Sequence, residues 1–334
     1  MGITQWDQDD QGMFDGCLAV DRAAWQADDP DGPPRSARML RTLLTGMAVG
    51  DTETWCATDG TQVRGWYRLH LPSRENLDTG ILELVVDPGE RRLGLGTELL
   101  RHAASRAAER DRSRLLGEPL QSGGAAEFAK AVGARAGLPE ARRFLHVAAI
   151  PSGRIAGLRA SATSAATGYS VLCWTGVVPD GHLDGVAYVR EAMNDAPSEP
   201  ENEYVRWDAR RVREQLNPRI EAFGYRLYTV AAVHDETGQM AALTHLSVDP
   251  EFPEWGFQQM TAVVRPHRGH RLGLLVKSAM LEWLATAEPG LRTIFTGNAD
   301  TNQHMIAINE QLGYEQVHPG WQAQTLDVAA FLSR

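Results

Sequence analysis

Residues 81–97 read ILELVVDPGERRLGLGT, a short apolar run followed by a turn rich in glycine and arginine. From Leu99 onward apolar residues recur at helical spacing, so the sequence predicts a strand, a tight loop and a helix in direct succession. Gly94 and Gly96 let a ligand approach the backbone closely, and the beginning of a helix attracts negative charge. We interpret the loop as a candidate site for a diphosphate. The alternative is an ordinary strand-to-helix turn with solvated arginines.

The same pattern recurs 177 residues later, so that Arg268 corresponds to Arg91. There the apolar run MTAVV is followed by the turn RPHRGHRLG at 265–273 and by a predicted helix over 274–284. In both copies a short strand and a second helix are expected next, at 114–117 and up to Gly133 in the first copy, and at 292–296 and from about Thr301 to Gly313 in the second. Such a repeat indicates that one domain is used twice.

We therefore divide the chain into two domains, residues 1–160 and 161–334. The stretch 160–168, rich in Ser, Thr and Ala, is the predicted linker between them. Upstream of the second loop, two apolar runs flank the turn HDETG. This arrangement predicts a β-hairpin formed by residues 225–233 and 239–248.

Composition indicates an ordinary globular protein. The 334 residues are 43% hydrophobic and 23% charged, and the net charge of -10 disfavours nucleic acid and anionic lipid as partners. The three cysteines are widely separated and odd in number, which favours a reducing compartment, the cytoplasm. No apolar run reaches the ~18 residues of a membrane span, and the N-terminus does not resemble a secretory signal. We expect no metal, because His267, His270 and His304 lack partners at ligand spacing.

The order Arg-x-x-Gly-x-Gly between a strand and a helix resembles the pyrophosphate-binding loop of the GNAT (Gcn5-related N-acetyltransferase) family. It differs from dinucleotide and Walker loops because the arginine leads and no Gly-Lys-Ser/Thr follows. The second loop departs from the family pattern at Arg271, which stands in place of the middle glycine. Residues 296–314 resemble the strand-to-helix segment in which GNAT asparagines contact CoA. The resemblance covers both halves, as in tandem-domain GNAT proteins of actinobacterial type, and is distantly like mycothiol synthase.

The resemblance implies an α/β (α+β) fold with two GNAT-like domains, each a mixed, mostly antiparallel central sheet flanked by helices. It also implies acetyl-CoA, or another acyl-CoA, as cofactor. The implied contacts in the first half are Val85, Val86, Arg91, Arg92, Leu93, Gly94, Leu95, Gly96 and Thr97. Those in the second half are Val263, Val264, Arg268, Gly269, His270, Arg271, Leu272, Gly273, Leu274, Asn298 and Asn302. Asn302 can equally cap the helix that follows it.

The implied reaction is direct acyl transfer from the thioester to a small-molecule primary amine. Many family members use a tyrosine acid five residues before the aromatic of a Gly-Phe ending, where this chain has Asn309 and, in the first half, Ala129. The candidate catalytic residues are Asn309, Tyr314, Gln259 and His245. Structural roles remain open for Tyr314 and His245. We expect the second half to catalyse, and the first half to bind CoA without turnover or to serve as a scaffold.

Two other functions stay open. The missing tyrosine is compatible with a non-catalytic acyl-CoA-binding or regulatory protein, and tandem domains of similar fold also occur in aminoacyl-tRNA-dependent transferases, which the charge of -10 disfavours. Residues 193–203, predicted to be a loop, carry several carboxylates that favour either a cationic acceptor or simple solvation. A monomer and a homodimer are equally compatible with the sequence.

Overall fold

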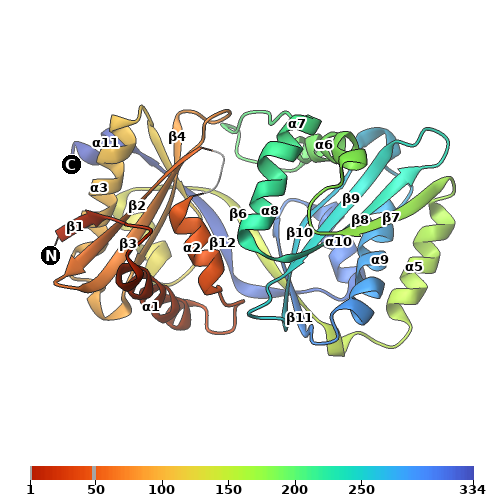
Figure 1. Cartoon of the computed structure of the whole chain (residues 1–334), viewed down its shortest axis with the longest axis horizontal. Coiled ribbons are helices and arrows are strands. Elements are labelled where there is room, and N and C mark those ends of the chain that lie inside the picture. Colours follow the sequence, from red (N-terminus) through yellow and green to blue (C-terminus); the bar gives the residue numbers. More distant parts are fainter. Residues whose placement is uncertain (1, 47–49) are drawn as a thin grey trace. The chain divides into compact units, whose positions relative to one another are not determined.

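The computed structural model describes residues 2–46 and 50–334, which fall into two compact units (Figure 1). The first unit comprises Met1–Pro139, Glu201–Glu203 and Pro319–Arg334, and the second comprises Glu140–Pro200 and Tyr204–His318. The predicted domains are contiguous, whereas these units are not. The reason is that β6 (Arg135–His146) begins in the first unit and ends in the second, while β12 (Glu315–Asp327) does the reverse.

The first unit is built on an antiparallel sheet that contains one parallel pair. Its strands lie in the order β1-β2-β3-β4-β5-β12, and β4 and β5 are the parallel neighbours. The C-terminal part of the chain supplies the strand next to β5, where Gln324 pairs with Gly117 and Asp327 with Arg114. The bounds are β1 (Gly2–Gln5), β2 (Asp51–Asp59), β3 (Gln62–Leu71), β4 (Thr79–Val86) and β5 (Arg114–Gly117).

Helices cover both faces of this sheet. Successive side chains of a strand point to opposite faces, so Trp66 and Tyr67 of β3 belong to different core clusters. Trp66 packs in the cluster of Phe14 and Leu40, and Tyr67 in that of Leu99. The helices are α1 (Gln11–Asp28), α2 (Ala37–Thr45), α3 (Leu95–Glu109), α4 (Gly124–Val132) and α11 (Val328–Leu332), with a short 3₁₀ turn, η1 (Pro88–Glu90), before α3. We conclude that α1 and α2 cover one face and α3 the other.

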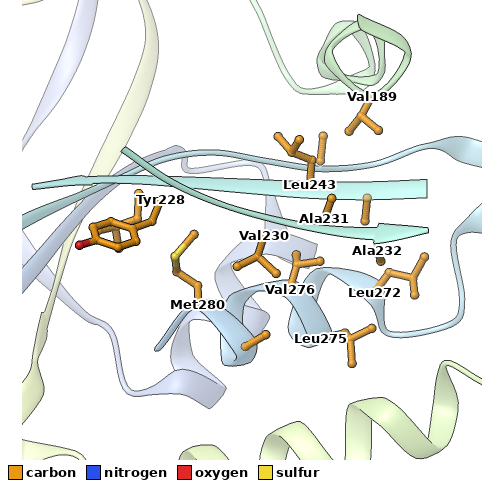
Figure 2. Packing of buried hydrophobic residues seen from close by; sticks show 14 of the residues in the cluster. Val189, Tyr228, Val230, Ala231, Ala232, Leu243, Leu272, Leu275, Val276 and Met280 are labelled. Atoms are coloured by element: carbon orange, nitrogen blue, oxygen red, sulfur yellow. The ribbon is translucent and has the colours of Figure 1, made fainter. Parts of the chain in front are cut away.

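The second unit repeats this plan. Its strands lie in the order β6-β11-β10-β9-β8-β7, and β10 and β11 are the parallel pair. The strands are β7 (Tyr169–Thr175), β8 (Arg226–His234), β9 (Met240–Val248), β10 (Trp255–Val263) and β11 (Thr293–Ala299). The helices are α5 (Arg154–Ala165), α6 (Leu183–Glu191), α7 (Ala209–Arg211), α8 (Asn217–Phe223), α9 (Leu272–Ala287) and α10 (Gln303–Leu312). Figure 2 shows Val189 of α6 on one side of the strands and Val276 and Met280 of α9 on the other.

The structure confirms the predicted repeat and the fold class. The succession β4-α3-β5-α4 returns as β10-α9-β11-α10, and α9 begins 177 residues after α3, at Leu272 against Leu95. The predicted hairpin is β8 and β9, which pair antiparallel. Both sheets are mixed, mostly antiparallel and flanked by helices, as expected.

The predicted linker at 160–168 is wrong, because its first six residues belong to α5. Alanine is the strongest helix former, and small side chains allow close helix contact. Helix α5 packs against α9, which also packs on β8 and β9, and α9 is buried at every residue from Leu272 to Leu281. A stretch of small residues therefore forms a helix that covers another helix.

Helix ends follow local chemistry. Asp10 and Ser36 cap α1 and α2 by accepting the N–H of the third residue along. Gly133 and Gly313 end α4 and α10 with positive φ, a conformation that glycine adopts at low cost. Both of these ends agree with the sequence prediction.

Two cysteines that are far apart in the sequence meet in the core of the first unit. The sulfur atoms of Cys17 and Cys56 lie 3.4 Å apart, and both thiols are buried. The hydrogen bond between them and their burial raise the pKa of Cys17. Among the described residues, no helix is long and apolar enough to cross a membrane.

Candidate functional site

In each unit the two parallel strands stop pairing several residues before the glycine- and arginine-rich loop. The β4–β5 pairing covers Thr79–Ile81, although β4 continues to Val86. The β10–β11 pairing covers Trp255–Phe257, although β10 continues to Val263. Backbone groups along such a continuing edge need another partner, and an extended ligand can supply it. Val85, Val86 and Val263 lie on these edges, and Val264 follows directly, with its N–H bonded to Ala241 O at 2.9 Å.

The two loops share a backbone conformation although their glycines stand at different positions. Positive φ occurs at Arg92 and Gly94 in the first loop and at Gly269 and Arg271 in the second. These are corresponding positions, so arginine and glycine have exchanged places. A non-glycine residue in this conformation costs about 1 kcal/mol. The shared feature is therefore the turn itself, and it does not depend on the order of its residues.

The leading arginine of each loop is engaged inside its own unit. Arg91 Nε donates to the carbonyl of the last β4 residue at 3.3 Å, and its terminal nitrogens bind Asp28 of α1 at 2.7 and 2.8 Å. Arg268 donates in the same way to the last β10 carbonyl at 3.2 Å and to Asp195 at 2.5 Å. Both arginines, which the sequence predicts as diphosphate contacts, thus tie the loop to the strand end and to a carboxylate.

The first loop is open to solvent. Arg92, Leu93 and Gly94 are exposed, and Leu93 has an exposed fraction of 73%. Within the described chain, a Cβ added at Gly94 would meet no atom within 4 Å. The first turn of α3 has no side-chain cap among the described residues, so the N–H groups of Leu95 and Gly96 are available to an anion, whereas that of Thr97 bonds Gly94 O at 3.0 Å. The backbone required for a diphosphate site is present and accessible here.

Arg271 closes the second loop. Its guanidinium donates to Ser161 Oγ of α5 at 2.7 Å and to Gln311 Oε1 of α10 at 3.3 Å. A Cβ at Gly273 would lie 3.1 Å from Ile308 of α10. Gly269 and His270 stay exposed, while Leu272 and Leu274 are buried in the core. Neither α9 nor α3 has a side-chain cap among the described residues, but at α9 the Arg271 side chain reaches from the loop to α5 and α10, whereas Gly94 places no side chain at the beginning of α3.

The opening between the strands also differs between the units. In the second unit Thr296 Oγ1 of β11 donates to Gln258 O of β10 at 3.2 Å, directly beyond the last paired residues. In the first unit Gly117 holds the position of Thr296, and it has no side chain to form such a bridge. The first unit therefore keeps both its loop and its strand edge open.

The predicted catalytic residues Asn309 and Tyr314 are buried in the second unit. Asn309 is 0% exposed, and its Nδ2 donates to Asn298 Oδ1 at 2.7 Å. Asn309 Oδ1 and the Tyr314 hydroxyl have no hydrogen-bond partner among the described residues. Burial raises the pKa of Tyr314. Asn302, by contrast, caps α10 by accepting the N–H of Met305 at 3.2 Å.

Lys277 of α9 lies in the same region, with its Nζ 5.1 Å from the centre of the Tyr314 ring. It is 2% exposed, and burial lowers the pKa of its ammonium to about 7. The unfolded chain holds this proton up to its ordinary pKa of 10.5, so it binds more protons than the folded protein between these values. The free energy of unfolding therefore increases as the pH rises from about 7 to 10.5, and burial of the lysine destabilises the fold most below this range.

We expect Lys277→Met to raise the free energy of unfolding by about 2 kcal/mol or more at and below neutral pH, because an apolar side chain replaces a buried charge. The gain over wild type should shrink as the pH approaches 10.5. Urea unfolding of both proteins across this pH range checks the prediction. A variant that is less stable than wild type at neutral pH would contradict it.

The other two predicted catalytic residues lie on the opposite face of the sheet. His245 is 2% exposed, its Nδ1 is 2.9 Å from Thr229 Oγ1, and its Nε2 is buried without a partner among the described residues. Burial and the nearby Arg190 lower its pKa to about 3, which makes it a weak base. Gln259 donates to Ser247 Oγ at 2.9 Å. The structure therefore does not gather the four predicted residues at one point.

The first unit contains a charged network that the sequence analysis missed. Arg35 bridges Asp21 of α1 at 3.1 Å and Glu83 of β4 at 2.6 Å, and Arg68 of β3 binds Glu83 at 3.1 Å. Burial acts against ionisation, but the two arginines hold the pKa of Glu83 below its ordinary value. Burial raises the pKa of Asp21. The available signal was a single glutamate inside the apolar run ILELVV.

Glu83 of this network lies three residues before Val86, the last residue of β4. Glu83 and Val85 point to the same face of β4, the face covered by α1 and α2. The side chain of Glu83 is 24% exposed, so a ligand on this face can reach it. Within the described residues, no group of three or more His, Cys, Asp or Glu is arranged to hold a metal ion.

Comparisons with known proteins agree with this geometry. Residues 17–133 match the acetyltransferase (GNAT) family profile. The whole structure resembles a tandem GNAT protein from the clavulanic acid biosynthesis pathway, with 28% identity, a TM-score of 0.80 and 98% of each chain covered. It also resembles a GCN5-related N-acetyltransferase from Sphaerobacter thermophilus, with 16% identity, a TM-score of 0.66, and 98% of this chain and 95% of that chain covered. No curated protein matches the chain in sequence.

The family match falls on the unit whose loop and strand edge are open, and the structural likeness extends over both units. A GNAT fold supports acyl transfer from acyl-CoA in general. The chain therefore has the fold of a tandem GNAT protein, and its residues 17–133 match the GNAT acetyltransferase family.

Proposed function

We propose that this protein transfers an acyl group, with acetyl as the expected group, from acyl-CoA to a primary amine of a small molecule, and that the first unit binds the CoA. This places the reaction in the first unit, whereas the sequence favoured the second. The observation that carries the proposal is the contrast at one corresponding position: Gly94 is surrounded by open space, and Arg271 bridges Ser161 and Gln311.

The residues of the first unit fit the diphosphate of CoA. The N–H groups of the first turn of α3 lack a side-chain cap among the described residues, and the helix dipole adds positive potential there. Arg91 is held by Asp28, which fixes the loop before any ligand arrives. An anion that binds here does not have to order the loop first, so less binding energy is lost.

The strand edge and the charged network are suited to bind the two reacting groups, the thioester and the amine. The thioester supplies the activated acyl group when it is bound. Free backbone N–H groups on β4 beyond Ile81 are suited to orient its carbonyl, because they belong to a rigid sheet. Glu83 is ionised at neutral pH, since Arg35 and Arg68 lower its pKa, and a carboxylate on this face attracts the ammonium of an amine.

A non-catalytic acyl-CoA-binding protein is the second candidate. Ala129 stands where many relatives have the tyrosine acid, and Asn309 stands there in the second unit. Such a protein would bind acyl-CoA without releasing free thiol in the presence of any amine.

Calorimetry and a thiol-release screen test both candidates on the full chain. We expect acetyl-CoA to bind with a stoichiometry of one per chain, because the second loop is closed. We also expect thiol release with at least one member of a panel of polyamines, aminoglycosides, amino acids and amino-sugar thiols. Binding of two molecules per chain would contradict the assignment to one unit, and binding without thiol release would favour the second candidate.

A further inference from the structure

The α6 face of the second unit contains a cation without a counter-ion. Arg190, in the last turn of α6, has no hydrogen-bond or ion-pair partner among the described residues, and its Nε is buried. Its guanidinium carbon lies 4.2 Å from the centre of the Trp207 ring, and that of Arg211 lies 4.6 Å from the same ring. Burial and the neighbouring Arg219 and Arg211 lower the pKa of Arg190 to about 10, so it remains charged at neutral pH.

An unpartnered imidazole faces the same region. His245 of β9 lies two residues after Leu243, and Figure 2 shows Leu243 on the side of the strands where Val189 of α6 lies. Residues two apart on a strand share a face, so His245 points toward α6 as well. Its Nε2 is buried without a partner among the described residues, and the charge of Arg190 acts on it.

The carboxylates closest to this region in the chain are already in use. Glu191 accepts the N–H of Trp207 at 3.0 Å, and Asp208 accepts the N–H of Arg211 at 2.6 Å. Asp195 is bound to Arg268. Arg190 is half-buried with its Nε fully buried, and a guanidinium in such a place without a carboxylate is costly, so the arrangement indicates a ligand that supplies one.

Comparison with the first unit shows which group the second unit lacks. At an offset of 177 residues, Arg68 corresponds to His245 and Glu83 to Met260. In the first unit the carboxylate of Glu83 neutralises two arginines. In the second unit the corresponding side chain is a thioether, which cannot neutralise Arg190.

We propose that the second unit binds a small carboxylate between α6 and β9, with its oxygens on Arg190 and on His245 Nε2, in the place that the Glu83 carboxylate holds in the first unit. The ligand class is a monocarboxylate with an apolar body, since Trp207 offers an aromatic surface beside the guanidinium. This site is independent of CoA binding by the first unit.

The test is a titration of the full chain with acetate, propionate and benzoate, each beside its neutral amide, at constant ionic strength. The signal is the resonance of ¹³C-labelled His245, which is identified by its loss in His245→Gln. We expect a saturable shift with at least one carboxylate and none with its amide. A hydrogen bond to a charged group contributes about 1.5–3 kcal/mol, so Arg190→Met should weaken the binding roughly tenfold or more.

Arg213→Met is the matched control, because Arg213 is an exposed cation of the same unit, paired with Asp180. It should bind the carboxylate as wild type does. We further expect Arg190→Met to unfold at the same temperature as wild type or higher, since it removes an unpartnered buried charge. The proposal would be overturned by equal binding of acid and amide, by equal affinity in Arg190→Met and wild type, or by the absence of saturation with every acid. If Arg190→Met does not fold, weaker binding measured for His245→Gln by calorimetry decides in its place.

Discussion

Gly94→Glu is expected to abolish CoA binding and, with it, acyl transfer. The substitution places a carboxylate at the beginning of α3, where backbone N–H groups and the helix dipole are available to a diphosphate. Two like charges about 4 Å apart at a protein surface repel by roughly 4 kcal/mol, so affinity should fall at least 100-fold. Calorimetry with CoA and thiol release with acetyl-CoA measure the two effects.

Arg271→Glu is the matched control, because Arg271 holds the corresponding position in the second loop. It should leave CoA affinity and turnover near the wild-type values, although loss of the contacts to Ser161 and Gln311 will lower stability modestly. Gly94→Ala tests for folding defects, since it adds a methyl group in open space at a strained φ. If Arg271→Glu abolishes turnover and Gly94→Glu does not, the catalytic unit is the second one.

Glu83→Gln is expected to lower kcat/KM for the amine about 100-fold and to leave CoA affinity unchanged. The substitution keeps the shape and hydrogen-bonding capacity of the side chain but removes the charge that attracts an ammonium. Loss of a buried charge interaction of about 3 kcal/mol corresponds to this factor. Steady-state thiol release at varied amine, together with CoA calorimetry, separates the two steps.

Glu109→Gln is the control for Glu83→Gln, because Glu109 is an exposed carboxylate at the far end of α3 in the same unit, paired with Arg106. It should behave as wild type in both measurements. Unchanged kcat/KM in Glu83→Gln would remove this residue from the proposed acceptor site. A parallel loss of CoA affinity would instead indicate that the network with Arg35 and Arg68 only supports the fold.

The local elements were predictable because their signals are local. A glycine that follows a helical pattern ends the helix, because it adopts positive φ at low cost, and Gly133 and Gly313 do so here. The hairpin β8-β9 follows from two apolar runs around a glycine-containing turn. The stretch 160–168 misled the prediction because small residues suit both a linker and a helix packed closely against another helix. Only the neighbour, α9, distinguishes these two states.

The loops of the candidate site were predictable from the sequence, whereas the carboxylates that bind their arginines were not. Arg91 and Arg268 were identified by spacing, but their engagement with Asp28 and Asp195 joins residues 63 and 73 positions apart. Glu83 was overlooked because a single glutamate in an apolar strand has no periodic signal. Its importance follows from Arg35, which lies 48 positions away.

The sequence by itself determined that one strand-loop-helix domain is used twice, because hydrophobic period and turn residues act over a few positions. Tertiary structure alone decided which copy is open. Arg271 closes the second loop through Ser161, 110 positions away, and β12 completes the sheet of the first unit from the far end of the chain. Contacts of this kind depend on how distant segments fold together, and no local pattern encodes them.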